Sequence, residues 1–126
     1  MSAPILQQSI LNVTAFEIEL AGNVVIEVVT RSYRTVRGRS VCTAILDEVS
    51  FWRDDDSANP DTEVLNAVRA SMATFGSDAM VIAGSSPYAK RGILWDAHKR
   101  YYGRDNAKNL VWVAPTRTMN PTVPQY

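Results

Sequence analysis

Ser40-Val41-Cys42-Thr43-Ala44-Ile45-Leu46-Asp47-Glu48-Val49-Ser50-Phe51-Trp52 is the stretch that decides the fold. Its apolar run, residues 41–46, is too short for a core helix and has no helical period. The β-branched content is typical of a strand buried on both faces, as strands of parallel sheets are. Asp47 and Glu48 follow at the C-terminal end of this strand. Because open α/β sheets bind ligands at that end, the stretch predicts an acidic site at the edge of a parallel sheet.

An apolar strand followed by Asp47-Glu48 is also the pattern of a Walker B motif. In such a motif the aspartate holds magnesium, directly or through a water ligand, and the glutamate orients or deprotonates the attacking water. The alternative is a buried strand that ends at a solvated acidic turn. The surrounding residues must decide between the two.

The composition is that of one ordinary globular domain. The chain has 126 residues and a mass of 14.0 kDa, of which 46% are hydrophobic and 21% charged. Thirteen basic residues balance thirteen acidic ones, so no overall field attracts nucleic acid or membrane. Cys42 is the single cysteine, which excludes an internal disulfide, and its place in the apolar strand predicts inert core packing. No stretch approaches the roughly 20 apolar residues of a membrane span, and no secretory signal is visible, so we expect a cytosolic protein.

The chain on either side of this strand predicts alternating elements. Residues 1–14 allow a short helix or a lead into the first strand. The expected elements are a β-hairpin over 15–29, a basic loop over 31–39, an amphipathic helix over 60–73, a strand over 79–83, a helix over 88–102 and a strand over 110–114. Asn59 and Pro60 are typical of a helix start, and Gly76-Ser77-Asp78 of its end.

This order predicts an α/β fold in which a β-hairpin precedes parallel strands joined by crossover helices. We expect residues 1–114 to form one domain. Residues 115–126 contain three prolines and no apolar period, and they predict a tail or linker.

A second strand end completes the expected site. Ser85 and Ser86 follow the strand over 79–83, and parallel strands bring their carboxyl ends to one edge. With the arginines of the 31–39 loop nearby, carboxylates and hydroxyls at this edge suit phosphoryl transfer with magnesium. The single histidine, His98, has no second histidine or cysteine nearby, which argues against zinc.

One motif is missing from the sequence. No Gly-x-x-x-x-Gly-Lys-Ser/Thr phosphate loop occurs in the 126 residues, and no Gly-x-Gly-x-x-Gly dinucleotide motif does either. The residues therefore predict the downstream half of a nucleotide-hydrolysing site without its upstream half.

As an ordered set, five segments resemble the ATPase domain of the large terminase subunit of tailed bacteriophages, over roughly residues 15–124. The segments are Ser32-Tyr33-Arg34-Thr35-Val36-Arg37-Gly38-Arg39, Ala44-Ile45-Leu46-Asp47-Glu48-Val49-Ser50-Phe51-Trp52-Arg53, Asn59-Pro60-Asp61-Thr62-Glu63-Val64-Leu65-Asn66-Ala67, Ser85-Ser86-Pro87-Tyr88-Ala89-Lys90-Arg91-Gly92 and Ala114-Pro115-Thr116.

The resemblance implies a role for each site residue. Asp47 would hold Mg²⁺ and Glu48 would be the catalytic glutamate. Ser85 and Ser86 would form the coupling motif that senses the nucleotide and relays its state to DNA movement. Arg37 would be an arginine finger acting on a neighbouring subunit, with Arg34 and Arg39 as competing candidates.

The resemblance also implies the setting. The family is an ATP-driven motor in the bacterial host cytoplasm that packages double-stranded DNA, with the phage portal and a small terminase subunit as partners. The implied fold is a partial P-loop NTPase core of the ASCE type that lacks the phosphate-loop strand. We therefore expect a fragment of a phage or prophage terminase gene, with the nuclease domain missing after residue 126. It would not hydrolyse ATP alone or bind ATP and Mg²⁺ tightly, and its unpaired sheet edge would favour self-association.

Two other functions remain open. The chain could be a non-catalytic α/β domain that binds DNA or a protein partner through the Arg31–Arg39 loop. It could also be a magnesium-dependent nuclease that uses Asp47, Glu48 and the acidic run 54–56, although a solvated turn explains that run better.

Overall fold

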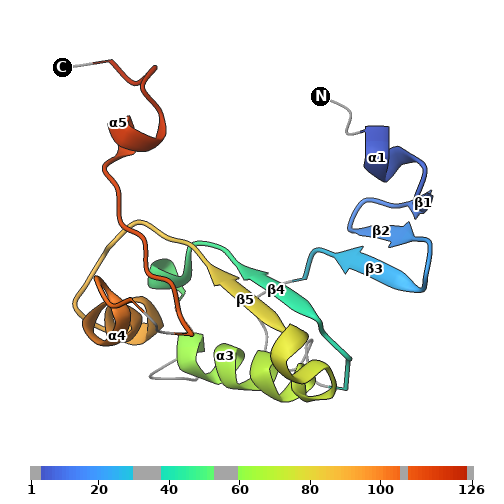
Figure 1. Ribbon diagram of the computed structural model, residues 1–126, viewed down its shortest axis with the longest axis horizontal. Coiled ribbons are helices and arrows are strands. Elements are labelled where there is room, and N and C mark those ends of the chain that lie inside the picture. The colour runs from blue at the N-terminus through green and yellow to red at the C-terminus, as the bar shows by residue number, and fades with distance from the viewer. Residues whose placement is uncertain (1–3, 30–37, 53–59, 106–107, 125–126) are drawn as a thin grey trace.

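A strand–helix–strand unit followed by a further helix forms the centre of the molecule. A computed structural model describes residues 4–29, 38–52, 60–105 and 108–124 (Figure 1). The central elements are β4 (Thr43–Leu46), the 3-10 helix η1 (Val49–Phe51), α3 (Pro60–Ser71), the 3-10 helix η2 (Ala73–Asp78), β5 (Met80–Ala83) and α4 (Gly92–Tyr101). β4 and β5 pair in parallel, in register from Thr43 opposite Met80 to Leu46 opposite Ala83. The predicted parallel strands with a crossover helix are confirmed, and the protein is mixed α/β.

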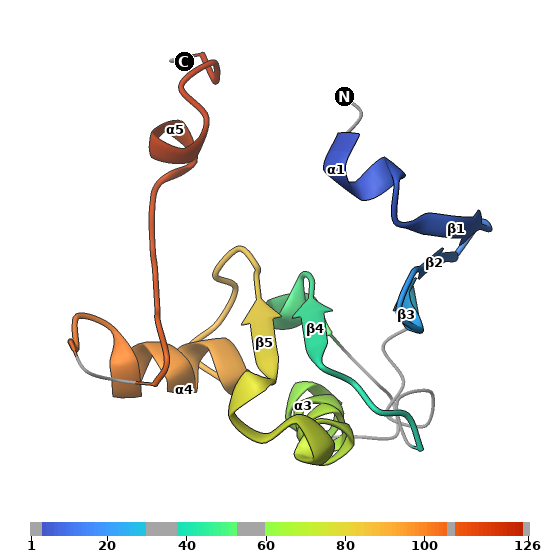
Figure 2. The same ribbon diagram turned by 45° about the vertical axis from the view of Figure 1, so that its right-hand side comes forward.

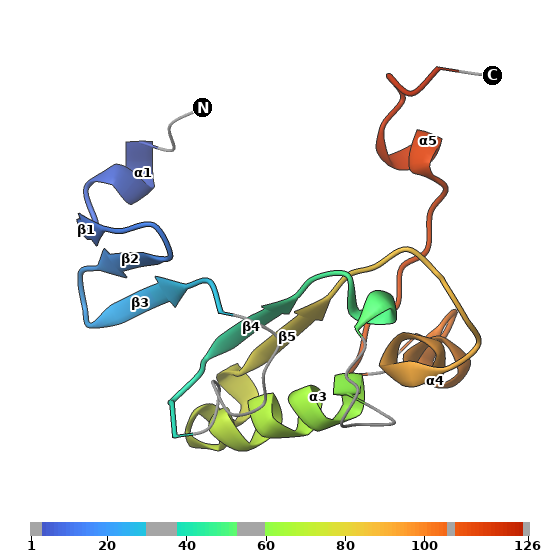
Figure 3. The ribbon, with the colours of Figure 1, turned by 180° about the vertical axis from the view of Figure 1, so that it is seen from behind.

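Helix α3 contributes Val64, Ala67 and Val68 to the buried core. It begins at Pro60, carries Asp61 and Glu63 in its first turn, runs beside β4 and β5 (Figure 3), and packs against the side of β4 that carries Ala44 and Leu46. The buried apolar side chains of the cluster are Leu46, Val49, Val64, Val68 and Met72. The predicted inner face of this helix is confirmed. The proposed N-cap, Asn59, lies outside the described residues.

The N-terminal part forms a separate antiparallel sheet. It comprises α1 (Pro4–Gln7), β1 (Ile10–Val13), β2 (Glu17–Leu20) and β3 (Val24–Glu27), in the order β1-β2-β3. The predicted hairpin is β2–β3, and its turn uses positive φ at Gly22 and Asn23, which both residues tolerate. β1 adds a third strand, and it lies in residues 1–14, for which the sequence allowed either a short helix or a lead into the first strand. Figures 1 and 2 show this sheet and the C-terminal α5 (Thr116–Met119) extending from opposite sides of the central unit.

β4 is covered on one face and β5 is exposed along its whole length, which corrects the prediction of a strand buried on both faces. Ile45 is 74% exposed, and Met80 and Ile82 on the same face are exposed too. Cys42 is also exposed, so its predicted core packing is wrong. The physical reason is that the core cluster covers only the side of β4 that carries Ala44 and Leu46, and no described element forms a layer over its other side or over β5.

Three boundaries also differ from the prediction. Residues 110–114 form no strand, because nothing among the described residues pairs with them, and Leu110 is 93% exposed. α4 begins at Gly92 rather than residue 88, and α3 ends at Ser71 rather than residue 73, with η2 following it. The expected tail contains α5. No helix in the described part of the chain is long and apolar enough to cross a bilayer.

Candidate functional site

The carboxyl ends of β4 and β5 bring two of the predicted site residues into contact. Asp47 and Glu48 directly follow β4, and Ser85 and Ser86 follow Gly84 at the end of β5. The hydroxyl of Ser85 donates a hydrogen bond to Oε2 of Glu48 at 3.3 Å. Residues 37 positions apart are thus joined at the edge where parallel sheets place their ligands.

Ser85 is the centre of a small hydrogen-bond network. Its Oγ accepts a bond from the backbone N–H of Ser50 at 3.2 Å. Its hydroxyl also lies 3.2 Å from the carbonyl oxygen of Ser86. A hydroxyl has one proton, so Ser85 donates either to the Glu48 carboxylate or to the Ser86 carbonyl. The network therefore has two alternative states.

Glu48 sits in an unusual backbone conformation. Its φ of 53° and ψ of 37° are left-handed, a region that costs a residue with a side chain about 1–2 kcal/mol. This turn ends β4 and leads into η1. The indole N–H of Trp52 donates to the carbonyl oxygen of Asp47 at 2.9 Å and closes the turn from the other side. Backbone strain of this kind clusters at functional sites.

The acidic pair suits magnesium that arrives with a phosphorylated ligand. Asp47 and Glu48 are exposed, and Mg²⁺ in proteins commonly uses one or two carboxylates with waters and substrate phosphates. Among the described residues no group of three or more histidine, cysteine, aspartate or glutamate side chains is arranged to hold a metal. A magnesium ion at this pair would need further ligands, such as phosphate oxygens and waters.

Of the three arginines predicted as candidates for the finger, the structure describes one. Arg37 and its competitor Arg34 fall outside the described residues, as does the acidic run 54–56. The other competitor, Arg39, is described, and its guanidinium forms an ion pair with Glu27 at the end of β3.

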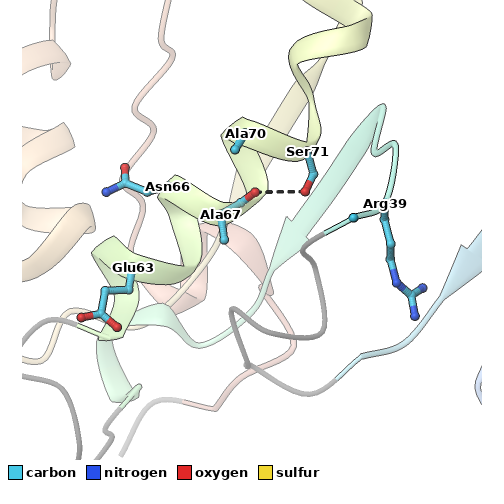
Figure 4. Close-up of a pocket in the computed structure, with 7 residues that line it drawn as sticks. Arg39, Glu63, Asn66, Ala67, Ala70 and Ser71 are labelled. Carbon is cyan, nitrogen blue, oxygen red and sulfur yellow. Dashed lines mark hydrogen bonds between the residues drawn. The ribbon is translucent and has the colours of Figure 1, made fainter.

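A hollow of about 710 Å³ beside α3 is separate from this site. Figure 4 shows Glu63, Asn66, Ala67, Ala70 and Ser71 of α3 along one side of it, and Arg39 pointing away from the helix. The dashed line there is the bond from the Ser71 hydroxyl to the Ala67 carbonyl, 3.1 Å. No predicted nucleotide or magnesium residue lines this hollow.

Asp61 makes a contact that was not predicted from the sequence. Its side chain is buried, Oδ2 accepts the backbone N–H of Ile93 at 2.7 Å, and Oδ1 accepts that of Thr62 at 2.9 Å. One carboxylate thereby binds the first turns of α3 and α4. The sequence explained Asp61 by the dipole of its own helix, and no local pattern links it to a residue 32 positions away.

Aromatic contacts add to the packing around the loop and α4. The rings of Phe51 in η1 and Tyr88 lie 5.3 Å apart, centroid to centroid. His98 is half-buried and stacks between Trp95 and Tyr102, at 5.8 and 4.6 Å. These two contacts make His98 a packing residue of α4.

Comparison with known proteins adds no relative, since the chain matches no protein-family model, no curated protein and no solved structure.

Proposed function

We propose that the chain carries the Walker B and coupling segments of a terminase-type ATPase core, the motor that packages DNA into phage capsids. The single observation that carries this proposal is the Glu48–Ser85 hydrogen bond at the shared carboxyl edge of two parallel strands. The crossover through α3 is compatible with a P-loop NTPase core of the ASCE type. The motif set described above supports the family, and the parent activity would be ATP hydrolysis in the bacterial cytoplasm.

In this proposal each residue acts through its own chemistry. Asp47 holds Mg²⁺, which, when bound with ATP, would neutralise charge on the phosphates. Glu48 holds or deprotonates the attacking water with its carboxylate, which in this structure accepts the hydrogen bond of Ser85. When the Ser85 proton turns to the Ser86 carbonyl, that carboxylate is released for the water. Ser85 and Ser86 thereby link the state of the site to the loop after β5.

The proposal also assigns limits and partners. The 126 residues contain no phosphate loop, so we expect neither ATP turnover nor tight binding of ATP and Mg²⁺ by them alone. Arg37 is the proposed finger toward a neighbouring subunit. Double-stranded DNA, the portal and the small terminase subunit are the proposed partners.

Self-association is part of the proposal because apolar sheet surface is open. Ile45, Met80 and Ile82 are exposed on one face of a two-stranded sheet, and sheet edges without a neighbour favour pairing with another chain. Light scattering across a concentration series tests this. A monodisperse monomer at high concentration would refute it.

The decisive experiment concerns ATP turnover. The reading frame that contains these residues is expressed with the coding sequence upstream of it, and DNA-stimulated hydrolysis is measured. Glu48→Gln should abolish turnover and leave nucleotide binding largely intact, because the amide cannot accept the proton of the water. Glu19→Gln in β2 is the matched control and should turn over ATP normally. Normal turnover in Glu48→Gln, or an upstream sequence without a phosphate loop, would overturn the proposal.

A second candidate is a non-catalytic domain that binds DNA or a protein through the Arg31–Arg39 loop. The observation that favours it is four arginines within nine residues of a chain with zero net charge. DNA affinity should then fall steeply with salt, since phosphate contacts release counterions. An absence of binding at low salt would remove this candidate.

A further inference from the structure

The loop between β5 and α4, residues 84–91, is held at both ends and in the middle. At its start Ser85 contacts Glu48 and Ser50. In the middle the Tyr88 ring packs on Phe51. At its end the Asp61 carboxylate receives the N–H of Ile93. The first two attachments come from the segment after β4, and the third comes from α3.

The third attachment is unusual because a side chain of α3 caps the N-terminus of another helix, α4. The residue at the N-cap position of α4, Arg91, makes no side-chain capping bond. The first N–H groups of a helix need a partner, and a carboxylate there is favoured by the helix dipole as well. Asp61 supplies that carboxylate from α3 at 2.7 Å, and it is buried.

The backbone conformation of Gly92 and its lack of a Cβ allow this contact. Its φ is +82°, and a Cβ at this position would lie 2.4 Å from Oδ2 of Asp61. Glycine is therefore required both by the left-handed conformation and by the close approach of the carboxylate. This contact joins α3 and α4 in addition to the apolar packing of Ile93 and Leu94.

We propose that Asp61 is a positioning residue, which holds the loop carrying Ser85 over Glu48 and makes α4 move together with that loop. The consequence of this anchoring for catalysis rests on the proposed function, in which Ser85 and Ser86 form the coupling segment. Its geometric part stands without ATP hydrolysis. Asp61 contacts neither nucleotide nor magnesium in this proposal.

The test uses NMR on the 126-residue chain with Asp61→Asn, which keeps the size of the side chain but leaves one oxygen for two N–H donors. The amide of Ile93 should exchange about tenfold faster or more, as expected for the loss of a bond to a charged group. The positioning role predicts more than this. The resonances of Ser85, Tyr88 and the Glu48 carboxylate should shift as well.

Asp96→Asn on α4 is the matched control. It also removes one negative charge, from an exposed side chain that pairs with Lys99, and it should leave Ser85 and Glu48 unchanged. If Asp61→Asn changes only the first turns of α3 and α4, Asp61 joins helices and the proposal is overturned.

A reciprocal variant covers the case in which Asp61→Asn fails to fold. Coupling between two sites is mutual, so Ser85→Ala should accelerate exchange at Ile93 in the otherwise unchanged chain. No change at Ile93 would overturn the proposal. If these shifts occur while Glu48→Gln hydrolyses ATP normally in the longer protein, the proposed function fails and the positioning role stands.

Discussion

Replacing Gly92 by alanine should destabilise the protein for two separable reasons. The first is the backbone, because alanine at φ +82° costs about 1–2 kcal/mol. The second is the contact, because the new Cβ would lie 2.4 Å from Oδ2 of Asp61 and displace it from the N–H of Ile93. A hydrogen bond to a charged group contributes about 1.5–3 kcal/mol.

The two effects together predict a loss of about 2–4 kcal/mol for Gly92→Ala, after a gain of about 0.4–1 kcal/mol from the less flexible unfolded chain. Urea unfolding followed by tryptophan fluorescence measures this loss. With an m value of about 2 kcal/mol per molar, the midpoint should fall by about 1–2 M.

Two other glycines separate the contributions. Gly103 has a φ of +67°, and a Cβ added there would have nothing within 4 Å, so Gly103→Ala should show the backbone cost alone. Gly84 has neither a positive φ nor a close neighbour, so Gly84→Ala should change stability by about 0.5 kcal/mol or less. The reasoning is refuted if Gly92→Ala is no more destabilising than Gly103→Ala. It is also refuted if Asp61→Ala and Gly92→Ala are additive, because the first removes the clash that the second creates.

Three further predictions concern burial and backbone strain. Met72→Ala should cost about 2–5 kcal/mol in urea unfolding, because Met72 is 5% exposed, whereas Met80→Ala on the open sheet face should cost about 0.5 kcal/mol or less; equal costs would contradict the one-sided core. Cys42 should react with a thiol reagent in the native protein nearly as fast as in urea, because it is exposed, and strong native protection would contradict this. Glu48→Asn should be more stable than Glu48→Ala by about 0.5–1 kcal/mol, because both remove the contact with Ser85 and only asparagine tolerates the left-handed conformation, and equal stabilities would contradict the assigned strain.

The sequence predicted those elements whose pattern is local. Pro60, the acidic first turn and the apolar spacing of Val64, Val68 and Met72 lie within or directly beside α3 and identify it without reference to the rest of the chain. The β2–β3 hairpin is equally local, because the turn residues and the alternation lie side by side. β4 and β5 were predicted as parallel neighbours from the helix between them.

What depends on a distant neighbour was not predicted. Residues 110–114 have the composition of a strand, but a strand also needs an adjacent edge, and composition does not report one. The exposure of Ile45 was not predicted for the same reason, because an apolar run does not indicate whether a second layer covers the strand. For the site, reasoning from the strand ends brought Glu48 and Ser85 together correctly. It missed Asp61, whose partner Ile93 is near only after α3 and α4 pack.

Two residues with left-handed backbone, Glu48 and Gly92, lie at the two contacts that hold the loop after β5. Glu48 adopts this conformation at a cost, although glycine or asparagine would adopt it more easily. Its side chain contacts Ser85. Gly92 adopts it without cost and leaves room for the Asp61 carboxylate. Each end of the loop is thus fixed by a carboxylate, that of Glu48 at Ser85 and that of Asp61 at the N–H of Ile93, beside Gly92.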